Sequence, residues 1–560
     1  MFGYFALGET AYGELPKGVD HSVPSDFKLL LANPKAEFTY LVVLEPYDST
    51  KTLNLAGSPP YGSVAFGQLD TPYRGGVEKF YLSDKGYSTR PDDSVMPNVY
   101  FAPKVDNPYT LDLSLFAGTD QSGFSNASAP GFGSLRIVNG DGSLDALSSM
   151  SWRGRKVKIY TGKNDFSFSQ FELIFDGVSA GIEVDDTHIV INLSDQSYLL
   201  DRLIEQNQYT GAGDYEGFDD LKGTPKPLAY GHLFNITPTL IDSARLIYQI
   251  HDGSIQAVDS VRDRGVEITF EADTGDIFNT APAAGFYNTD LSRGLIRLGS
   301  TPDGNITTDC KGENTGSFVE TIGTIMVRIL QTRMGVNAIG NDIINKPAFG
   351  TLDAESGVHI TGETVASDLL DEVINPFGGY WSFTRKGVLT AGLLSNPILE
   401  EYTINPDYIE FNGVELLGVF PAVWKQRVAY KPVGTVQKSD DLASSTTTPT
   451  RELVSEEYRY LLSEKRTVRS ADKNAVDRTD YLPAVESVDA QVVLDRLVAL
   501  FSKERRLFRV SVRNMLFRLY LGTVVKLVYP RFGLDSGQLF IVIGFSEDAE
   551  TDTTILELWG

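Results

Sequence analysis

Residues 156–193 read KVKIYTGKNDFSFSQFELIFDGVSAGIEVDDTHIVINL, and this stretch decides the fold class. Three short runs in it, 156–160, 171–175 and 189–193, alternate apolar and polar residues or are rich in β-branched and aromatic residues. Runs of this length and composition are typical of β-strands, whose successive side chains point to opposite faces of a sheet. The stretch therefore predicts three strands in close succession.

Similar runs recur across the chain, at 39–44, 266–270 and 524–529. The segments between such runs favour tight turns, because glycine supplies the positive φ angles that these turns need. These predicted turns are Asn139–Gly142, Asp176-Gly177, Asp252-Gly253 and Lys386-Gly387. The 560 residues include 52 glycines, 26 prolines, 31 phenylalanines and 26 tyrosines, a mixture of turn formers and strand-favouring rings.

Helical periodicity is confined to three segments. In Phe318–Met334 apolar residues recur at the spacing of one buried helix face, and Gly335 follows as a C-terminal cap. Val365–Ile374 has the same pattern and is stopped by Pro376. A third helix is predicted at about 488–506. We therefore predict a mainly β fold: a multidomain protein of antiparallel β-barrels or sandwiches with a few packed α-helices, α+β overall.

The length predicts about three to five domains. Two seams, rich in glycine and proline or in serine and threonine, lie at 209–227 and 442–450. We predict four parts: an N-terminal β region of two loop-rich subdomains, a β domain, a helix-containing α+β domain, and a C-terminal β-barrel domain. Their residues are 1–222, 223–315, 316–404 and 405–560, the last with a polar insertion at about 436–486 and the helix at about 488–506.

Charge and cysteine content exclude several classes of protein. With 49 basic and 74 acidic residues the net charge is −25, which disfavours binding to a phosphate backbone; the densest basic cluster lies within 503–513. The single cysteine, Cys310, excludes a disulfide scaffold, a four-cysteine zinc site and a cysteine-ligated iron–sulfur cluster. No apolar stretch is long enough to span a bilayer, and the first thirty residues do not resemble a leader peptide, so we expect a soluble, unprocessed chain.

Catalytic motifs are missing from the sequence. It contains no Gly-x-Ser-x-Gly, His-Glu-x-x-His or Gly-x-x-x-x-Gly-Lys motif. Asn139–Asp145 alternates oxygen-bearing side chains as a calcium loop does but lacks the final glutamate, so a turn between strands is the preferred interpretation. The histidines are dispersed, at 21, 188, 232, 251 and 359. We predict no catalytic, cofactor-binding or metal site, no cofactor, no enzymatic activity and no role for Cys310.

Five segments spread along the chain are informative together: Phe5–Ala11, Phe132–Asp145, Lys226–Asp242 with the following Ile247–Gly253, Gly378–Leu389 and Leu521–Leu534. They resemble tail proteins of long-tailed bacteriophages, in particular the tail-tip or baseplate hub proteins of siphophages and the related tail tips of gene transfer agents. The fourth segment resembles the hairpin region of the tail-tip proteins, and the fifth resembles the closing barrel of the hubs.

The resemblance implies a structural virion protein at the distal end of the tail, assembled in the host cytoplasm. Hubs of this family are trimers of β-barrel domains that close the tail tube and anchor the tip or fibres, and DNA passes through them without specific binding. The implied partners are two further copies of the chain, the distal tail ring protein, the tape measure protein, tail fibre or central tip proteins, and a host surface receptor. One departure is that a single Cys310 cannot hold the iron–sulfur cluster of some related hubs.

Two alternatives stay open. A distal tail ring protein, a hexamer that joins tube to tip, fits the same resemblance. A carbohydrate-active β enzyme that uses an Asp/Glu pair, or a sugar-binding adhesin, fits the acidic, tyrosine-rich composition.

Overall fold

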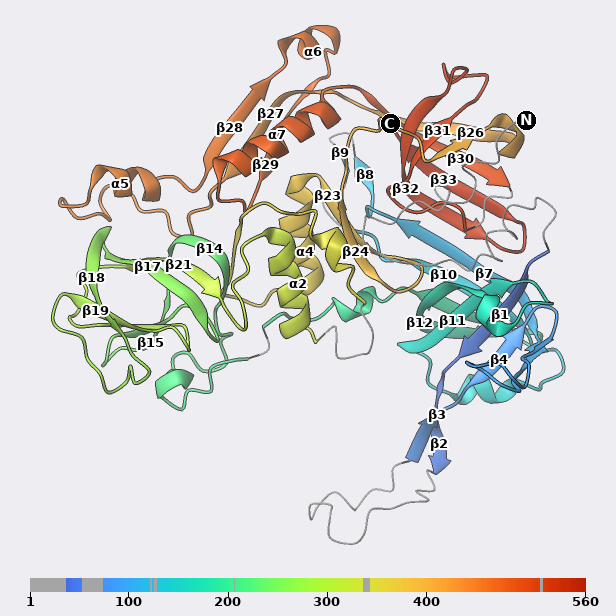
Figure 1. Ribbon diagram of the computed structural model, residues 1–560, viewed down its shortest axis with the longest axis horizontal. Coiled ribbons are helices and arrows are strands. Elements are labelled where there is room, and N and C mark those ends of the chain that lie inside the picture. Colours follow the sequence, from blue (N-terminus) through green and yellow to red (C-terminus); the bar gives the residue numbers. More distant parts are fainter. Residues whose placement is uncertain are drawn as a thin grey trace.

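The computed structural model describes residues 37–52, 74–120, 123–124, 128–205, 207–335, 343–513 and 517–560 (Figure 1). The first resembling segment, Phe5–Ala11, and His21 lie outside the described residues.

A fifteen-stranded sheet joins strands from both ends of the chain. In Figure 1 its C-terminal strands, in red, lie above its N-terminal strands, in blue and teal. The order along the sheet is β26 (Ile409–Phe420), β30 (Arg505–Arg513), β33 (Thr553–Trp559), β32 (Gln538–Asp548), β7 (Val105–Ser114), β10 (Phe132–Val138), β13 (His188–Ser194), β12 (Glu172–Val184), β11 (Arg155–Gly162), β1 (Thr39–Leu44), β4 (Phe80–Ser83), β6 (Tyr100–Pro103) and β5 (Tyr87–Ser88). Off this path, β31 (Val524–Leu527) pairs with β32 and β25 (Tyr402–Ile404).

The antiparallel pairing of β7 with β32 makes the two halves one sheet. It runs from Ser114 opposite Gly544 to Thr110 opposite Asp548. One hydrophobic core lies under both halves and includes Leu111, Leu135 and Ile191 from the N-terminal strands together with Val510 and Phe540 from the C-terminal strands. In β10, β13 and β30 the buried residues largely alternate, so polar side chains occupy much of the opposite face of these strands. On the C-terminal strands part of that opposite face is buried too, because Leu507, Ile541, Ile543 and Trp559 belong to a second core, shared with the central helices.

The predicted strands at 39–44, 156–160, 189–193, 266–270 and 524–529 are confirmed. The predicted turn at Asp176-Gly177 is wrong, because both residues lie inside β12, which continues to Val184. Gly177 is needed there for space: a Cβ at this position would lie 2.5 Å from the Ser194 carbonyl oxygen of the neighbouring strand. Glycine thus marks a close backbone approach here instead of a turn.

A second sheet of nine strands has its own core and contains the buried Cys310. Its order is β15 (Thr239–Asp242), β16 (Ile247–Gln249), β20 (Leu295–Leu298), β19 (Phe286–Asp290), β18 (Val266–Asp273), β17 (Ile255–Asp263), β21 (Ile306–Glu313), β14 (Leu228–Ile236) and β22 (Gly357–Ile360). Small two-stranded sheets are formed by β2 (Tyr47–Thr52) with β3 (Arg74–Val77) and by β8 (Thr119–Asp120) with β9 (Gly123–Phe124).

Helices and a hairpin lie between the sheets (Figure 1). The two central helices predicted from periodicity are confirmed as α2 (Ile322–Thr332) and α4 (Ala366–Ile374), and they bury their apolar faces in one large core. A short 3-10 turn and Gly378, at φ 65°, then lead into the hairpin of β23 (Gly379–Phe383) and β24 (Leu389–Leu393). The short helix α3 (Lys346–Phe349) packs against this hairpin.

A third unit combines a three-stranded sheet with α7 (Ser487–Phe501), which packs on one side of it. The order of the sheet is β28 (Arg459–Glu464), β27 (Val423–Tyr430) and β29 (Val476–Tyr481), and the helices α5 (Thr448–Val454) and α6 (Arg466–Ala471) flank β28. The predicted helix at 488–506 ends five residues early, because Arg505 and Arg506 belong to β30 and pair with β26 and the C-terminal end of the chain.

The predicted fold class is confirmed: the chain is mostly β-sheet with a few packed helices. The division at 222, 315 and 404 stays a prediction.

Phe508 offers a test of the shared core, because its ring is fully buried and meets Phe540 edge-on at 5.5 Å between ring centroids. We expect Phe508→Ala to lower the free energy of unfolding by about 3–5 kcal/mol. The measurement is urea-induced unfolding. The control Val492→Ala changes an exposed side chain on α7 and should stay within about 0.5 kcal/mol of the wild type. Equal effects of the two variants would contradict the shared core.

Candidate assembly surface

A buried ion pair joins the central hairpin to the large sheet. Arg385, in the turn between β23 and β24, donates from both terminal nitrogens to the Glu547 carboxylate of β32, at 2.9 and 3.2 Å. The two residues are only 4% and 1% exposed. Two parallel donors on a planar guanidinium match a carboxylate, which fixes the distance and the angle between hairpin and sheet.

The neighbours of the pair add further contacts to the carboxylate and to the guanidinium. The Tyr109 hydroxyl of β7 and the Phe517 backbone N–H each donate to Glu547 at 3.0 Å. The Arg385 guanidinium also lies 5.1 Å from the ring centroid of Phe545, a cation–π distance. Burial works most strongly on Arg385 and lowers its pKa, but Glu547 together with Tyr520 and Tyr109 more than offsets this, so the pKa of Arg385 is raised. The Arg385 guanidinium therefore stays charged in the core.

The hairpin tip also contacts the N-terminal half of the sheet. The Arg385 carbonyl oxygen accepts a hydrogen bond from the Asp176 backbone N–H of β12 at 2.8 Å. The next residue, Lys386, forms an ion pair with Glu172 of the same strand. The predicted turn at Lys386-Gly387 makes this possible, since Gly387 has φ 72°. One turn thus links the C-terminal strands, the N-terminal strands and the helical centre.

The exposed face of the large sheet carries arginines that are paired across strands. Arg509 lies 3.7 Å from Glu415 of β26 and 3.4 Å from Glu557 of β33. Arg513 lies 2.6 Å from Glu410 of β26. On the N-terminal half, Arg136 contacts two carboxylates, those of Asp106 and Glu550, at 2.5 and 3.0 Å. These cations are therefore neutralised within the sheet.

The arginines of the basic cluster in 503–513 are consequently directed to different partners and do not form one continuous stripe. Arg505 is buried and donates to the Leu500 carbonyl oxygen at 3.0 Å, and Arg506 donates to the Phe532 carbonyl oxygen at 2.8 Å. Sequence reasoning could not see these partners, because most of them lie outside the cluster in sequence.

Strand β26 is the edge of the large sheet, and among the described residues only β30 pairs with it. Phe411 is 95% exposed, because a bulge at Asn412, with φ 58°, turns it out of the sheet. Three further apolar side chains of β26 are exposed: Leu416, Leu417 and Val419. A long edge with apolar side chains is a template for pairing with another chain.

The other sequence candidates have ordinary structural places. Asn139–Asp145 forms a turn in which the Asn139 side chain accepts from the Leu144 backbone N–H at 2.8 Å. Cys310 is buried, and burial raises the pKa of its thiol. In the described part of the chain no three His, Cys, Asp or Glu side chains are grouped so that they could hold a metal ion, and no helix there is long and apolar enough to cross a membrane.

Two histidines of the second sheet region are buried and neutral. His251 accepts a hydrogen bond at Nδ1 from the Ala229 backbone N–H at 3.0 Å, and burial lowers its pKa to about 3. Burial lowers the pKa of His359, in β22, to about 4.

Comparison with known proteins gives matches among solved structures alone. No protein-family model and no curated protein matches the chain. A tail protein from Neisseria meningitidis matches 81% of this chain and 91% of its own length, at 9% identity and a TM-score of 0.31. A gene transfer agent virion chain matches 60% of this chain and 84% of its own length, at 13% identity and a TM-score of 0.38. A component of the Escherichia coli type VI secretion system, described as similar to the T4 bacteriophage tail proteins gp27 and gp5, matches 81% of this chain and 73% of its own length, at 8% identity and a TM-score of 0.31.

The descriptions of these structures name tail, virion and tail-like secretion proteins, and tail proteins are also the class that the sequence resembles. At such TM-scores and identities they define no residue correspondence, so no site is carried over from them.

The ion pair makes a direct prediction. Arg385→Met should lower the free energy of unfolding by about 3–5 kcal/mol, because it leaves the Glu547 carboxylate buried without its counter-charge. Arg385→Met combined with Glu547→Gln removes both charges and should cost less than Arg385→Met alone. Urea-induced unfolding measures both. A double variant at least as unstable as the single one would contradict the role given to the pair.

The buried histidines predict acid sensitivity. A histidine whose pKa is lower in the folded state binds a proton more readily when unfolded, so stability should fall as the pH drops from about 6.5 towards 4, by at most about 1.4 kcal/mol per pH unit for each histidine. His251→Asn keeps an acceptor near Ala229 and removes the titration, so its unfolding free energy should depend less steeply on pH in this window. If the unfolding free energies of wild type and variant had the same slope against pH, His251 would not be the source of the acid sensitivity.

Proposed function

We propose that the chain is a structural subunit of a phage-type tail, the hub at the distal end of the tail tube. The observation that carries the proposal is the large sheet: it combines strands from both ends of the chain over one shared core and ends in the exposed edge strand β26. Such a subunit is suited to continue its sheet into a neighbouring copy. The resemblance of five sequence segments to hub proteins supports the same role.

We propose a homotrimer. Each chain contributes two sheet halves, joined at β7 and β32 and fixed by Arg385 and Glu547. Three chains with two halves each present six surfaces, which is what a trimer needs to match a sixfold ring above it. The proposed ring is the distal tail protein, with the tape measure protein inside the tube and tail fibre or central tip proteins below.

The exposed sheet face suits a channel wall for DNA. Its arginines are held by carboxylates, and the whole chain has a net charge of −25, so a wall of this kind would repel a phosphate backbone. We therefore propose that DNA passes along this face without specific binding. We assign the chain no catalytic role.

The edge strand tests the assembly. Phe411→Asp combined with Leu417→Asp should leave the unfolding curve of the isolated chain unchanged, because both side chains are exposed, and should abolish trimers. Light scattering coupled to size exclusion gives the mass, and single-particle imaging gives the symmetry. The control Val492→Glu replaces an exposed valine of α7 and should keep the trimer.

Symmetry separates the alternatives. A threefold ring with a central hole supports the hub. A sixfold ring would assign the chain to the distal tail ring instead. A monomer of both wild type and variant at all concentrations, even with the ring protein added, would refute assembly through β26, and hydrolysis of glycans would then be the next assay.

A further inference from the structure

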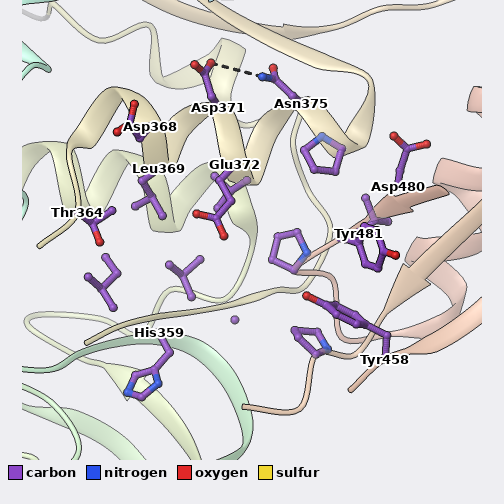
Figure 2. Close-up of a pocket in the computed structure, with 18 of the residues that line it drawn as sticks. His359, Thr364, Asp368, Leu369, Asp371, Glu372, Asn375, Tyr458, Asp480 and Tyr481 are labelled. Atoms are coloured by element: carbon purple, nitrogen blue, oxygen red, sulfur yellow. Dashed lines mark hydrogen bonds between the residues drawn. The ribbon is translucent and has the colours of Figure 1, made fainter. Parts of the chain in front are cut away.

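A cavity of about 740 Å³ lies between α4 and the three-stranded sheet (Figure 2). Its walls come from α4, from β22 and from β29 with the loop that follows it. Figure 2 shows the Glu372 side chain on the helix side and the Tyr458 side chain on the sheet side, both directed into the space between. The volume is typical of sites for small ligands or for a short peptide segment.

Two tyrosines form the sheet side of the cavity. The rings of Tyr458 and Tyr481 meet edge-on, with 5.2 Å between centroids and 66° between planes. Tyr481 is 51% exposed, whereas Tyr458 is half-buried. An aromatic pair held rigid and partly open to solvent offers ring faces to a ligand at little cost in conformational entropy.

Two of the carboxylates that line the cavity have structural duties. Asp371 accepts hydrogen bonds from the Trp381 indole N–H at 2.7 Å and from the Ser128 hydroxyl at 2.9 Å. Asp480 accepts from Arg478 and from the Gln426 amide. These contacts hold α4 and β29 in place and leave other side chains to meet a ligand.

The other two carboxylates that line the cavity, those of Asp368 and Glu372, lie one helical turn apart on α4 and are exposed. Neither contacts a cation in the described part of the chain, and no lysine or arginine is among the described residues that line the cavity. Burial and the charges of Glu457 and Glu372 raise the pKa of Tyr458. The negative charge is thus concentrated beside the tyrosine ring and is not compensated.

We propose that this cavity binds an arginine or lysine side chain carried by an extended segment of a partner protein. Carboxylates beside an aromatic face supply the two interactions that a cation makes best, the charge-assisted hydrogen bond and the cation–π contact. Arginine suits the site better than lysine, because its flat guanidinium stacks on a ring while it donates sideways to Glu372. The exposed side chains of Tyr460 and Leu462 on the neighbouring β28 extend the surface for the rest of the segment.

This proposal does not rest on the proposed function. The cavity lies away from β26, and no residue used in the assembly test lines it. Binding of a cationic segment and trimer formation can therefore succeed or fail separately.

The probe is a fluorescein-labelled pentapeptide with two arginines set between glycines, titrated with the full chain at low ionic strength and followed by fluorescence anisotropy. The matched peptide carries citrulline, which keeps the shape and loses the charge. We expect the arginine peptide to bind about tenfold tighter than the citrulline peptide. Equal binding, or no binding of either peptide, would overturn the proposal.

Variants then locate the binding. Asp368→Asn combined with Glu372→Gln should weaken arginine-peptide binding about tenfold, with an unchanged unfolding curve because both side chains are exposed. Asp219→Asn combined with Asp220→Asn removes the same charge from an exposed loop and controls for general attraction to an acidic protein. This control should bind within about twofold of the wild type. Equal weakening by both double variants would show nonspecific attraction and overturn the site.

Discussion

The ion pair between Arg385 and Glu547 is the contact on which the arrangement of this protein depends. Burying two charges is costly, and the cost is offset only because the geometry is bidentate and because Tyr109 and the Phe517 backbone supply further donors. A hydrophobic contact at this place would let the hairpin of β23 and β24 slide along the sheet. A bidentate pair permits one position, and since the turn that carries Arg385 also bonds to β12, that position fixes both halves of the sheet against the helical centre.

The large sheet separates two tasks between its faces. The buried face forms a single core under strands that are hundreds of residues apart in sequence. On the exposed face, charged side chains form ion pairs across neighbouring strands. Surface pairs of this kind contribute little to stability. Their consequence is electrostatic: carboxylates of the same sheet occupy these cations, which is what the proposed passage of DNA without specific binding requires. Two places on the described surface have unused capacity for binding. The edge strand β26 has unpaired backbone groups and exposed apolar side chains, and the carboxylates beside α4 have no cationic partner among the described residues.

Much of the local structure could be predicted. Strand periodicity located β1, β11, β13 and β18, and the apolar stripe on each central segment located α2 and α4 to within a few residues. The predictions were wrong where one residue type is compatible with two kinds of local structure. Gly177 has the composition of a turn, yet it lies within β12 because a neighbouring backbone leaves no room for a Cβ. Arg505 and Arg506 continue a helical pattern, yet they lie in β30 because they pair with β26.

The sequence by itself determined the fold class, the turns at Asn139–Gly142 and Lys386-Gly387, and the lack of known catalytic motifs, because these follow from periodicity and residue type over a few neighbouring positions. Only the tertiary structure decided that both ends of the chain share one sheet, that Arg385 meets Glu547 across 162 residues, and that the arginines of β30 are already paired. It also brought Tyr458 opposite Glu372. The physical reason is that pairing between distant strands and between buried charges depends on which surfaces fold against each other, and a local pattern carries no record of its distant partner.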